Sequence, residues 1–235
     1  MSDYYVRKIL DESQIRLIQE LINRRDSEWS SGLRTFGDSD GHKKIKKNEE
    51  MTGPIESLNQ ITDIVFSGVD STVKFFSFTA PECSGTPMIT KTVPGGMYKA
   101  HHDSPDNGDF STTVFLSDPE TYSGGELCLN TLNGPLEFKL PAGNAITYKT
   151  GIPHQVNPVI SGVRYVSVFW TKSKFKDPRI RKIWGDIKIV CSALVDKHGY
   201  GNLPVMENIE DVEQEPYFVL QNIMNDLERD FNQKM

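Results

Sequence analysis

The spacing of apolar residues changes along the chain, and its first part has the period of helices. We predict a helix from Asp11 to about Ser30, because apolar residues recur there three and four positions apart. Asp11 is suited to cap this helix, with Gln14 three residues later to complete a capping box. The apolar stripe of the helix consists of Ile15, Leu17, Ile18, Leu21 and Ile22. One face of this helix must therefore pack against another part of the protein.

A second helix is predicted from Gly53 to about Ser67, after a polar and strongly charged segment. Its expected buried stripe is formed by Ile55, Leu58, Ile61, Ile64 and Val65. The segment before it contains glycines, as loops do, and it carries the lysines Lys43, Lys44, Lys46 and Lys47. These lysines form either a solvated face or a specific anion site, and the pattern favours the solvated face.

From about Lys74 the pattern changes to that of β-strands. Short runs rich in β-branched and aromatic residues alternate with turn residues such as Pro94, Gly95 and Gly96. The predicted strands are Lys74–Thr79, Met88–Val93, Ser111–Leu116, Glu126–Asn130, Leu136–Leu140, Ala145–Tyr148, His154–Val156 and Arg164–Trp170. So many short strands in one stretch indicate a double-stranded β-helix, or jelly roll, with the preceding helices packed on the outside of one sheet.

The last part of the chain returns to helical spacing, with weaker signals. Phe175 to Val190 is predicted as a last strand or a helix, and Leu203 to Pro216 as an acidic loop. Tyr217 to Phe231 has the apolar period of a terminal helix, which either docks on the core or binds a partner. We therefore expect an α+β fold with an N-terminal helical support region (1–73), a jelly-roll core (74–175) and a C-terminal helical extension docked on that core (176–235).

Composition and charge narrow the classes of protein. Of the 235 residues, 37% are hydrophobic and 25% charged, as in ordinary globular proteins, and the net charge of -6 argues against a broad nucleic-acid surface. Cys83, Cys128 and Cys191 lie far apart, which indicates reduced thiols rather than a disulfide framework. The N-terminus lacks the apolar segment of a signal peptide, and no apolar run approaches the roughly 18 residues that span a bilayer. We expect a cytoplasmic protein without nucleic-acid or membrane partners.

Candidate chemistry concentrates in two segments of the strand-rich part. His101 and Asp103 flank a single residue, so in an extended chain both point to the same side, and His102 points away. His154 begins a later predicted strand, and antiparallel packing can bring it opposite the first pair. Two imidazoles and one carboxylate on one face of an iron ion leave three positions for a chelating cosubstrate and dioxygen. The pattern therefore predicts a metal site, although each short motif alone also occurs in ordinary loops and cores.

Arg164 adds a second kind of evidence. It opens a strongly apolar strand, where a permanent charge is costly unless it is paired or hydrogen-bonded. A guanidinium group forms two parallel hydrogen bonds with a carboxylate, which makes Arg164 a natural anchor for the far end of a dicarboxylate. By strand alternation Val166, Val168 and Trp170 share its face and line the same pocket. The competing interpretation of Arg164 is a salt bridge with an acidic residue of the chain.

These segments carry a family resemblance. The runs Y-K-A-H-H-D, N-G-D, S-T-T-V-F-L-S-D-P, G-G-E-L, K-L-P-A-G-N, P-H-Q-V-N-P-V and G-V-R-Y-V-S-V-F-W resemble iron(II)/2-oxoglutarate-dependent dioxygenases of the prolyl 4-hydroxylase type. The likeness covers roughly residues 75–173 and looks closest to the PKHD-type hydroxylases. The resemblance implies that the catalytic iron ligands are His101, Asp103 and His154 and that Arg164 binds the distal carboxylate of 2-oxoglutarate. It also implies cosubstrate or substrate contacts for Tyr98, Val156 and Trp170.

The resemblance further implies an activity. Oxidative decarboxylation of 2-oxoglutarate to succinate and CO2 would be coupled to hydroxylation of a C–H bond, with Fe(II) and O2 required and ascorbate as a supporting reductant. A protein or peptide substrate is expected, with proline favoured as the modified residue. Two positions depart from the family pattern: Thr92 and Phe115 stand where relatives carry tyrosine. Tyr148 or Thr113 are candidates for the hydrogen bond that Phe115 cannot make.

Two other functions stay open at the level of sequence. One is a hydroxylase of a free amino acid or another small molecule, for which a narrow, closed active-site mouth would be the signature. The other is a cupin-like metal-binding sensor without catalysis, because a fold alone does not establish activity. Arg164 discriminates against the sensor, since a bare metal sensor has no need for a dicarboxylate anchor.

Overall fold

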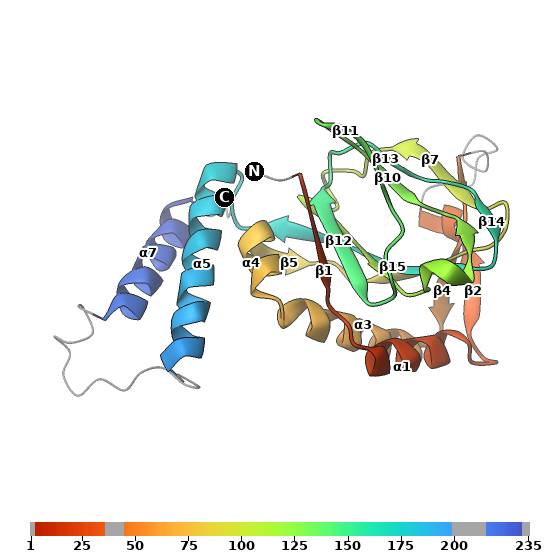
Figure 1. The fold of residues 1–235 in the computed structure, drawn as a ribbon, viewed down its shortest axis with the longest axis horizontal. Helices are drawn as coiled ribbons and strands as arrows, with labels where there is room; N and C mark the ends of the chain where they lie inside the picture. The colour runs from red at the N-terminus through yellow and green to blue at the C-terminus, as the bar shows by residue number, and fades with distance from the viewer. Residues whose placement is uncertain (1–2, 36–44, 199–214, 232–235) are drawn as a thin grey trace. The chain divides into compact units, whose positions relative to one another are not determined.

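The computed structural model describes residues 3–35, 45–198 and 215–231 (Figure 1). Contacts within the chain group it into two compact units, one formed by residues 1–69 and 84–171 and the other by residues 70–83 and 172–235. Each unit is described by itself. The predicted division into a support region (1–73), a core (74–175) and an extension (176–235) is a different partition and stays a prediction.

The first unit contains two antiparallel sheets. The larger sheet has the order β1-β12-β8-β15-β6-β4-β2 and the smaller one the order β11-β10-β13-β7-β3. The strands of the larger sheet are β1 (Tyr4–Lys8), β2 (Glu28–Ser31), β4 (Glu49–Gly53), β6 (Met88–Thr92), β8 (Phe110–Phe115), β12 (Asn144–Lys149) and β15 (Arg164–Ser173). Those of the smaller sheet are β3 (Lys46–Lys47), β7 (Met97–His101), β10 (Leu127–Thr131), β11 (Gly134–Phe138) and β13 (His154–Val156). The short strands β9 (Ser123–Gly124) and β14 (Val159–Ser161) pair with each other.

An apolar core joins the two sheets. Its buried members come from β8, β12 and β15 of the larger sheet and from β10 of the smaller one, and they are Phe115, Leu127, Leu129, Ile146, Tyr148 and Val166. Burial of apolar side chains from both sheets is the main force that holds such a sandwich together. The predicted double-stranded β-helix is therefore confirmed.

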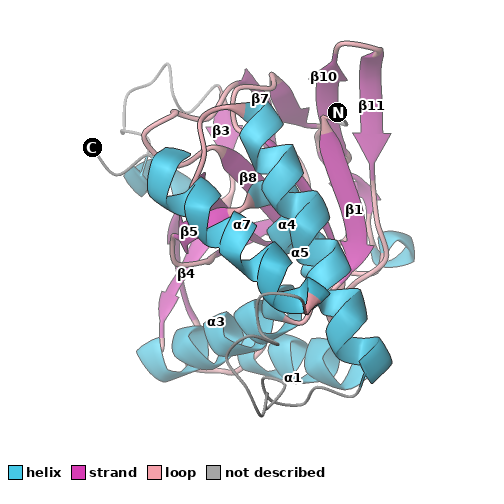
Figure 2. Ribbon diagram, turned by 90° about the vertical axis from the view of Figure 1, so that its left-hand side faces the viewer, coloured by secondary structure: helices cyan, strands magenta, loops and turns pink. Residues whose placement is uncertain are grey.

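Two helices of the first unit, α1 (Glu12–Ile22) and α3 (Ile55–Asp70), lie side by side in both ribbon views (Figures 1 and 2). They pack on the larger sheet, because the ring of Phe66 on α3 lies 5.5 Å from that of Phe169 on β15. The amide of Gln19 on α1 donates to the backbone oxygen of Leu116, just after β8. Val166 faces the core between the sheets and Phe169 faces the helices, as the alternation of β15 requires.

The first helix begins as predicted and ends earlier than predicted. Asp11 caps it in a complete capping box with Gln14. The helix ends at Ile22, with Asn23 as its C-cap, so the predicted extension to Ser30 is wrong. The chain instead turns and enters β2, where the Trp29 ring packs 5.8 Å from that of Tyr165. Tertiary packing of one aromatic residue outweighs the helical propensity of the polar residues before it.

The second unit contains α4 (Val73–Thr79), α5 (Pro178–His198) and α7 (Pro216–Phe231), with the short strand β5 (Pro81–Ser84) shared at its boundary. The prediction of a strand over Lys74–Thr79 is wrong, because these residues form α4. A short aromatic run fits either structure by period alone, and close packing on α5 decides for a helix. A Cβ at Gly185 of α5 would lie only 2.1 Å from the backbone oxygen of Ser77.

The helical C-terminal extension is confirmed at α5 and α7. Their shared core includes Phe175, Trp184, Cys191 and Met224, and the Trp184 indole donates to Glu228 at 2.9 Å. The predicted docking of this extension on the core stays a prediction. Lys43, Lys44 and the predicted acidic loop up to residue 214 lie outside the described residues. No helix within the described ranges is long and apolar enough to cross a membrane.

The short 3-10 helices η1 (Gly32–Thr35) and η2 (Pro119–Thr121) complete the described elements. Several strands escaped the sequence prediction: β1, β2, β3, β4, β5, β7, β9 and β14. Most of them are short or polar and lack clean alternation, so only their pairing partners define them as strands.

Two isoleucines of α3 test where its packing energy lies. Ile61 is fully buried, whereas Ile55, which was predicted to be buried with it, is 72% exposed. Ile61→Ala should lower the free energy of unfolding by about 2–5 kcal/mol because it leaves a cavity. Ile55→Ala, the matched control on the same helix, should change it by less than about 0.5 kcal/mol. Urea unfolding followed by circular dichroism measures both, and equal losses would contradict the packing described.

Candidate active site

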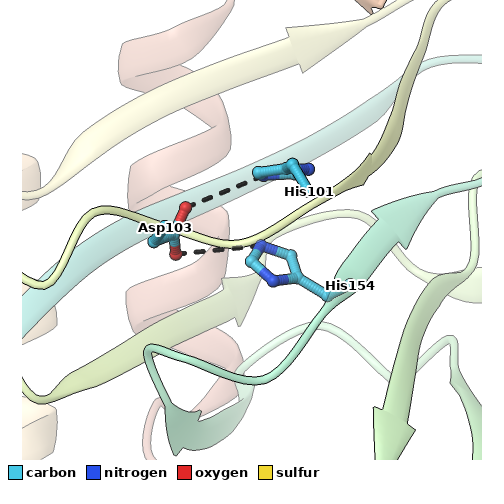
Figure 3. A group of neighbouring side chains, drawn as sticks. All are labelled: His101, Asp103 and His154. Carbon is cyan, nitrogen blue, oxygen red and sulfur yellow. Dashed lines mark ion pairs between the residues drawn. The ribbon is translucent and has the colours of Figure 1, made fainter.

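Three side chains meet on the smaller sheet of the first unit. His101 ends β7 and His154 begins β13, and the antiparallel register of these strands sets the two residues directly opposite each other. Asp103 follows β7, and its two carboxylate oxygens each lie 3.7 Å from one histidine Nε2 (Figure 3). One ligand atom from each residue lies within 4.8 Å of the others. His102 is exposed and stays outside this triad, as strand alternation predicted.

The hydrogen bonds of the two imidazoles fix which nitrogen faces the site. His101 Nδ1 lies 2.8 Å from the backbone oxygen of Lys99, and His154 Nδ1 lies 2.9 Å from that of Ile152. A carbonyl oxygen can only accept, so we assign the proton of each neutral ring to Nδ1. Both Nε2 lone pairs then face the Asp103 carboxylate without a proton between them.

This donor set fits a divalent cation. Three electron-rich groups that converge without an intervening proton repel one another unless a positive charge lies between them. Two histidines and one carboxylate on one face are the ligand set of non-haem Fe(II) oxygenases. The triad can therefore hold the iron ion that the sequence predicts.

The environment of His101 also favours its neutral, ligating form. Burial lowers the pKa of His101 to about 4, and the nearby His154 acts in the same direction. The hydrogen bond to the Lys99 carbonyl and the charge of Asp103 oppose this shift. A neutral imidazole at neutral pH is what a metal ligand requires.

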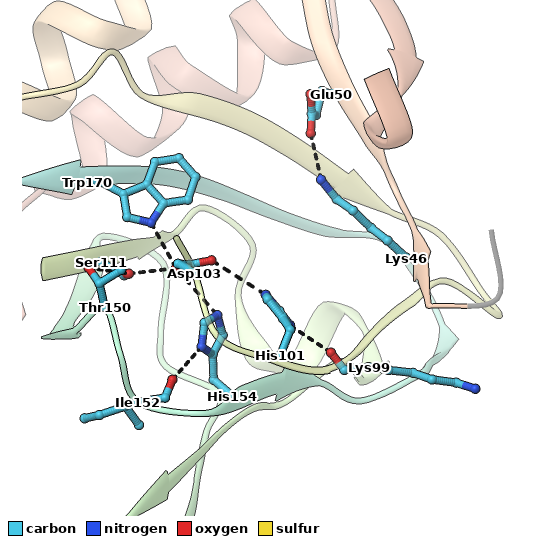
Figure 4. A network of polar contacts seen from close by, with 10 residues as sticks. All are labelled: Lys46, Glu50, Lys99, His101, Asp103, Ser111, Thr150, Ile152, His154 and Trp170. Atoms are coloured by element: carbon cyan, nitrogen blue, oxygen red, sulfur yellow. Dashed lines mark hydrogen bonds and ion pairs between the residues drawn. The ribbon is translucent and has the colours of Figure 1, made fainter. Parts of the chain in front are cut away.

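Asp103 is oriented by two donors that lie behind it. Oδ2 accepts hydrogen bonds from the Ser111 hydroxyl at 2.7 Å and from the Trp170 indole at 2.9 Å (Figure 4). Ser111 Oγ also lies 3.3 Å from Thr150 Oγ1. Sequence reasoning gave Ser111 no role at the triad, because it is one of three consecutive hydroxyl residues of β8 and nothing local distinguishes it from Thr112 and Thr113. Trp170 lines the cavity, its indole nitrogen donates to Asp103, and its predicted contact with cosubstrate or substrate stays a prediction.

A cavity of about 610 Å³ opens on the triad and also receives Arg164. Val166, Val168 and Trp170 line it, as the alternation of β15 predicted. Arg164 is only 3% exposed, and its guanidinium lies over the Phe115 ring at 5.6 Å. Within the described part of the chain it forms no ion pair, and its buried Nε has no hydrogen-bond partner. The alternative that Arg164 serves an internal salt bridge is therefore not supported.

Tyr122, Tyr148 and Glu126 act on the charge of Arg164. Burial lowers the pKa of Arg164, and Tyr122 foremost acts in the opposite direction. Thr113 and Tyr148, the candidate replacements for the hydroxyl that Phe115 lacks, both line the same cavity. Burial raises the pKa of Tyr148 well above its usual value, so its hydroxyl stays protonated and can donate.

Tyr98 and Val156 also line the cavity and face each other in the β7–β13 pairing. The Tyr98 ring stacks on the imidazole of His101, with the ring centroids 3.5 Å apart and the planes inclined by 19°. Burial raises the pKa of Tyr98 to about 12, with a further contribution from the charge of Asp103. The structure thus brings together every site residue that the sequence singled out.

Comparison with known proteins agrees with this geometry. The family model of the 2OG-Fe(II) oxygenase superfamily matches residues 87–172. A PKHD-type hydroxylase of Prochlorococcus marinus strain MIT 9215 is 31% identical over 84% of this chain and 90% of its own length. The chain belongs to the PKHD-type hydroxylase family. It is also 29% identical to the PKHD-type hydroxylase YbiX of Escherichia fergusonii, over 83% of this chain and 89% of that protein.

Solved structures share the fold of this PKHD-type family member. A prolyl hydroxylase from Trichoplax adhaerens, in complex with a peptide fragment of hypoxia inducible factor, matches with a TM-score of 0.60 and 16% identity, over 77% of this chain and 86% of that one. A Pseudomonas putida prolyl-4-hydroxylase matches with a TM-score of 0.52 and 17% identity, over 73% and 92%. The PKHD-type protein is thus a 2-oxoglutarate-dependent iron dioxygenase, which uses Fe(II), 2-oxoglutarate and O2.

The hydrogen bond from Ser111 predicts an effect on metal affinity. Ser111→Ala removes one of two donors that hold Asp103, and loss of such a partner typically weakens metal binding by about 10–100-fold. Ser167→Ala is the matched control, because Ser167 is a buried strand serine whose hydroxyl has no partner among the described residues. Calorimetric titration of the metal-free variants with Mn(II) measures the affinity. Equal affinities in the two variants would show that Ser111 does not orient Asp103.

The lowered pKa of His101 predicts a pH dependence of stability in the metal-free protein. The unfolded chain binds a proton near the usual histidine pKa of 6.5, whereas folded His101 resists protonation until about pH 4. The free energy of unfolding should therefore fall as the pH falls through this window. His101→Gln should make the fall less steep, and replacement of the exposed neighbour, His102→Gln, serves as the control. Denaturant unfolding at pH 7 and pH 5, with chelator present, measures both slopes.

Proposed function

We propose that this protein is a peptidyl hydroxylase that couples oxidative decarboxylation of 2-oxoglutarate to hydroxylation of a peptide residue, with proline favoured. The observation that carries the proposal is the presence of Arg164 and the triad on one cavity. A buried guanidinium without an ion pair, close to a metal-binding face, is suited to a ligand with two acidic ends.

In this proposal each group has a defined role. His101, Asp103 and His154 hold Fe(II), and Ser111 and Trp170 keep the Asp103 carboxylate in place. Arg164 binds the distal carboxylate of 2-oxoglutarate. Tyr148 and Thr113 donate the hydrogen bond for which Phe115 has no hydroxyl group. Tyr98 and Val156 shape the wall between metal and substrate. Ascorbate serves as a supporting reductant.

The bound iron and 2-oxoglutarate supply the oxidising power that turns O2 into an agent able to hydroxylate an unactivated C–H bond, with succinate and CO2 as products. The protein contributes binding and orientation. The guanidinium of Arg164 fixes one end of the cosubstrate, which limits how its other end approaches the triad. The apolar side chains of Leu127, Val166 and Val168 keep bulk water from that space.

Two features support a peptide as the substrate. The cavity of about 610 Å³ lies in the range of sites that enclose ligands larger than a dicarboxylate, so it offers room beside the cosubstrate. Its lining also combines Met88 and Met97 with polar Asn48 and Thr90. Methionines adapt to irregular apolar surfaces and polar side chains can bind a peptide backbone. The relatives' hydroxylase names and the peptide-bound Trichoplax enzyme point in the same direction.

Turnover of 2-oxoglutarate tests the reaction. The full chain, loaded with Fe(II) anaerobically and then given O2, ascorbate and 2-oxoglutarate, should form succinate, and Asp103→Ala should abolish this activity because iron loses its carboxylate ligand. Arg164→Gln should weaken binding of the cosubstrate or of N-oxalylglycine by on the order of 2–5 kcal/mol, because one carboxylate loses its buried charged partner. Arg164→Lys should fall between, since lysine keeps the charge but not the two parallel hydrogen bonds.

Peptides then test the substrate. Mass spectrometry of proline-containing peptides incubated with the active enzyme should detect a gain of one oxygen on proline. Succinate formation with free amino acids or other small molecules, and none stimulated by peptides, would favour a small-molecule hydroxylase. Failure of the metal-loaded protein to bind N-oxalylglycine would favour a sensor and contradict the proposal.

A further inference from the structure

Lys46, which lines the cavity outside the triad, belongs to a buried ion pair. Lys46 Nζ and Glu50 Oε1 are 3.0 Å apart, and their side chains are only 8% and 10% exposed (Figure 4). Removing two charges from water is costly, and apolar residues of similar volume are often equally stable at such positions. Stability alone therefore does not explain the pair, and the contacts of Lys46 indicate another role.

The lysine of this pair lies over an aromatic ring of the site. In the β3–β7 pairing Lys46 stands directly opposite Tyr98. Its Nζ lies 5.3 Å from the centroid of the Tyr98 ring, within the range of a cation–π interaction. Glu50 belongs to β4 of the larger sheet, so the pair joins a strand of each sheet.

The ring under Lys46 is the one that stacks on His101. The ring centroids of Tyr98 and His101 are 3.5 Å apart, and the two ring planes are nearly parallel. A hydrogen bond from Nδ1 to the Lys99 carbonyl fixes one edge of the imidazole, and the stack supports its face. Contacts thus run without a gap from Glu50 through Lys46 and Tyr98 to a triad histidine.

We propose that Lys46, held by Glu50, is a positioning residue that acts through Tyr98 to fix the imidazole plane of His101 for metal binding. The inference rests on the role of His101 in the proposed function. Partners that orient metal ligands commonly change metal affinity by about 10–100-fold when removed. Lys46 contacts His101 only through the ring of Tyr98, whereas its charge also acts on His101 directly through space.

A second lysine–glutamate pair, whose carboxylate comes from the neighbouring residue of β4, serves as a matched control. Lys91 pairs with Glu49 and lies over the Trp29 ring at 4.6 Å, which repeats the chemistry of the Lys46 pair. Glu49 precedes Glu50 on β4, so the two carboxylates point to opposite faces. Lys91 and Trp29 do not line the cavity.

Co(II) binding to the full-length, metal-free chain tests the inference. Calorimetry gives the affinity, and the visible absorption of bound Co(II) reports the geometry of its ligands. Lys46→Met, and the double variant Lys46→Met with Glu50→Met that removes both charges of the pair, should bind Co(II) at least about tenfold more weakly and with an altered spectrum. Lys46→Arg keeps the charge, the pair and the ring contact, so it should retain most of the affinity. Lys91→Met should match the wild type.

The outcomes separate this inference from the proposed function. If the wild-type chain binds no Co(II), both fall. If the wild type binds and the folded double variant binds equally well with an unchanged spectrum, the positioning role of Lys46 is wrong and the metal site stands. Loss of affinity in Lys46→Arg as large as in the double variant would also overturn the role, because that substitution preserves the proposed contacts.

Discussion

The antiparallel register that sets His154 opposite His101 is the constraint on which the whole cavity depends. A slip of one residue between β7 and β13 would turn one imidazole to the other face of the sheet, and the three side chains of the triad would no longer converge. The neighbouring strand on the other edge of β13 also fixes this register, because His154 pairs with Leu129 on β10. Leu129 is fully buried in the core between the sheets. Ordinary apolar packing thus determines where the two histidines of the triad meet.

Around that register the protein handles buried charge in three ways. The Asp103 carboxylate receives donors from Ser111 and Trp170, which leaves its remaining lone pairs to a cation. Lys46 and Glu50 neutralise each other within the protein. Arg164 has no ion pair among the described residues, and it is the charge that the proposed cosubstrate would neutralise. A metal ion and a dicarboxylate would supply the partners that the triad and Arg164 do not find within the described residues.

The departures from the family pattern fit this arrangement. Phe115 gives the Arg164 guanidinium an aromatic face in place of a hydroxyl, and Tyr148 and Thr113 bring hydroxyl groups to the same cavity from neighbouring strands. Thr92 pairs with Arg164 in the β6–β15 register and lines the cavity. A smaller side chain there leaves more of the cavity open than a tyrosine would. Substrate selection is therefore where this chain and its relatives are expected to differ.

The sequence by itself determined the jelly roll, the capped first helix and the terminal helix, and it predicted that His101, Asp103, His154 and Arg164 share one site. Strand alternation and motif spacing are local properties, and they suffice to say which side chains share a face. Only the tertiary structure decided that Lys74–Thr79 is helical, that Ser111 and Trp170 hold Asp103, and that Lys46 lies over Tyr98. The contacts of Trp170 with Asp103 and of Lys46 with Tyr98 join residues far apart in the chain, and packing between elements brings them within reach. Ser111 lies only eight residues from Asp103, but no period of a strand or helix relates the two.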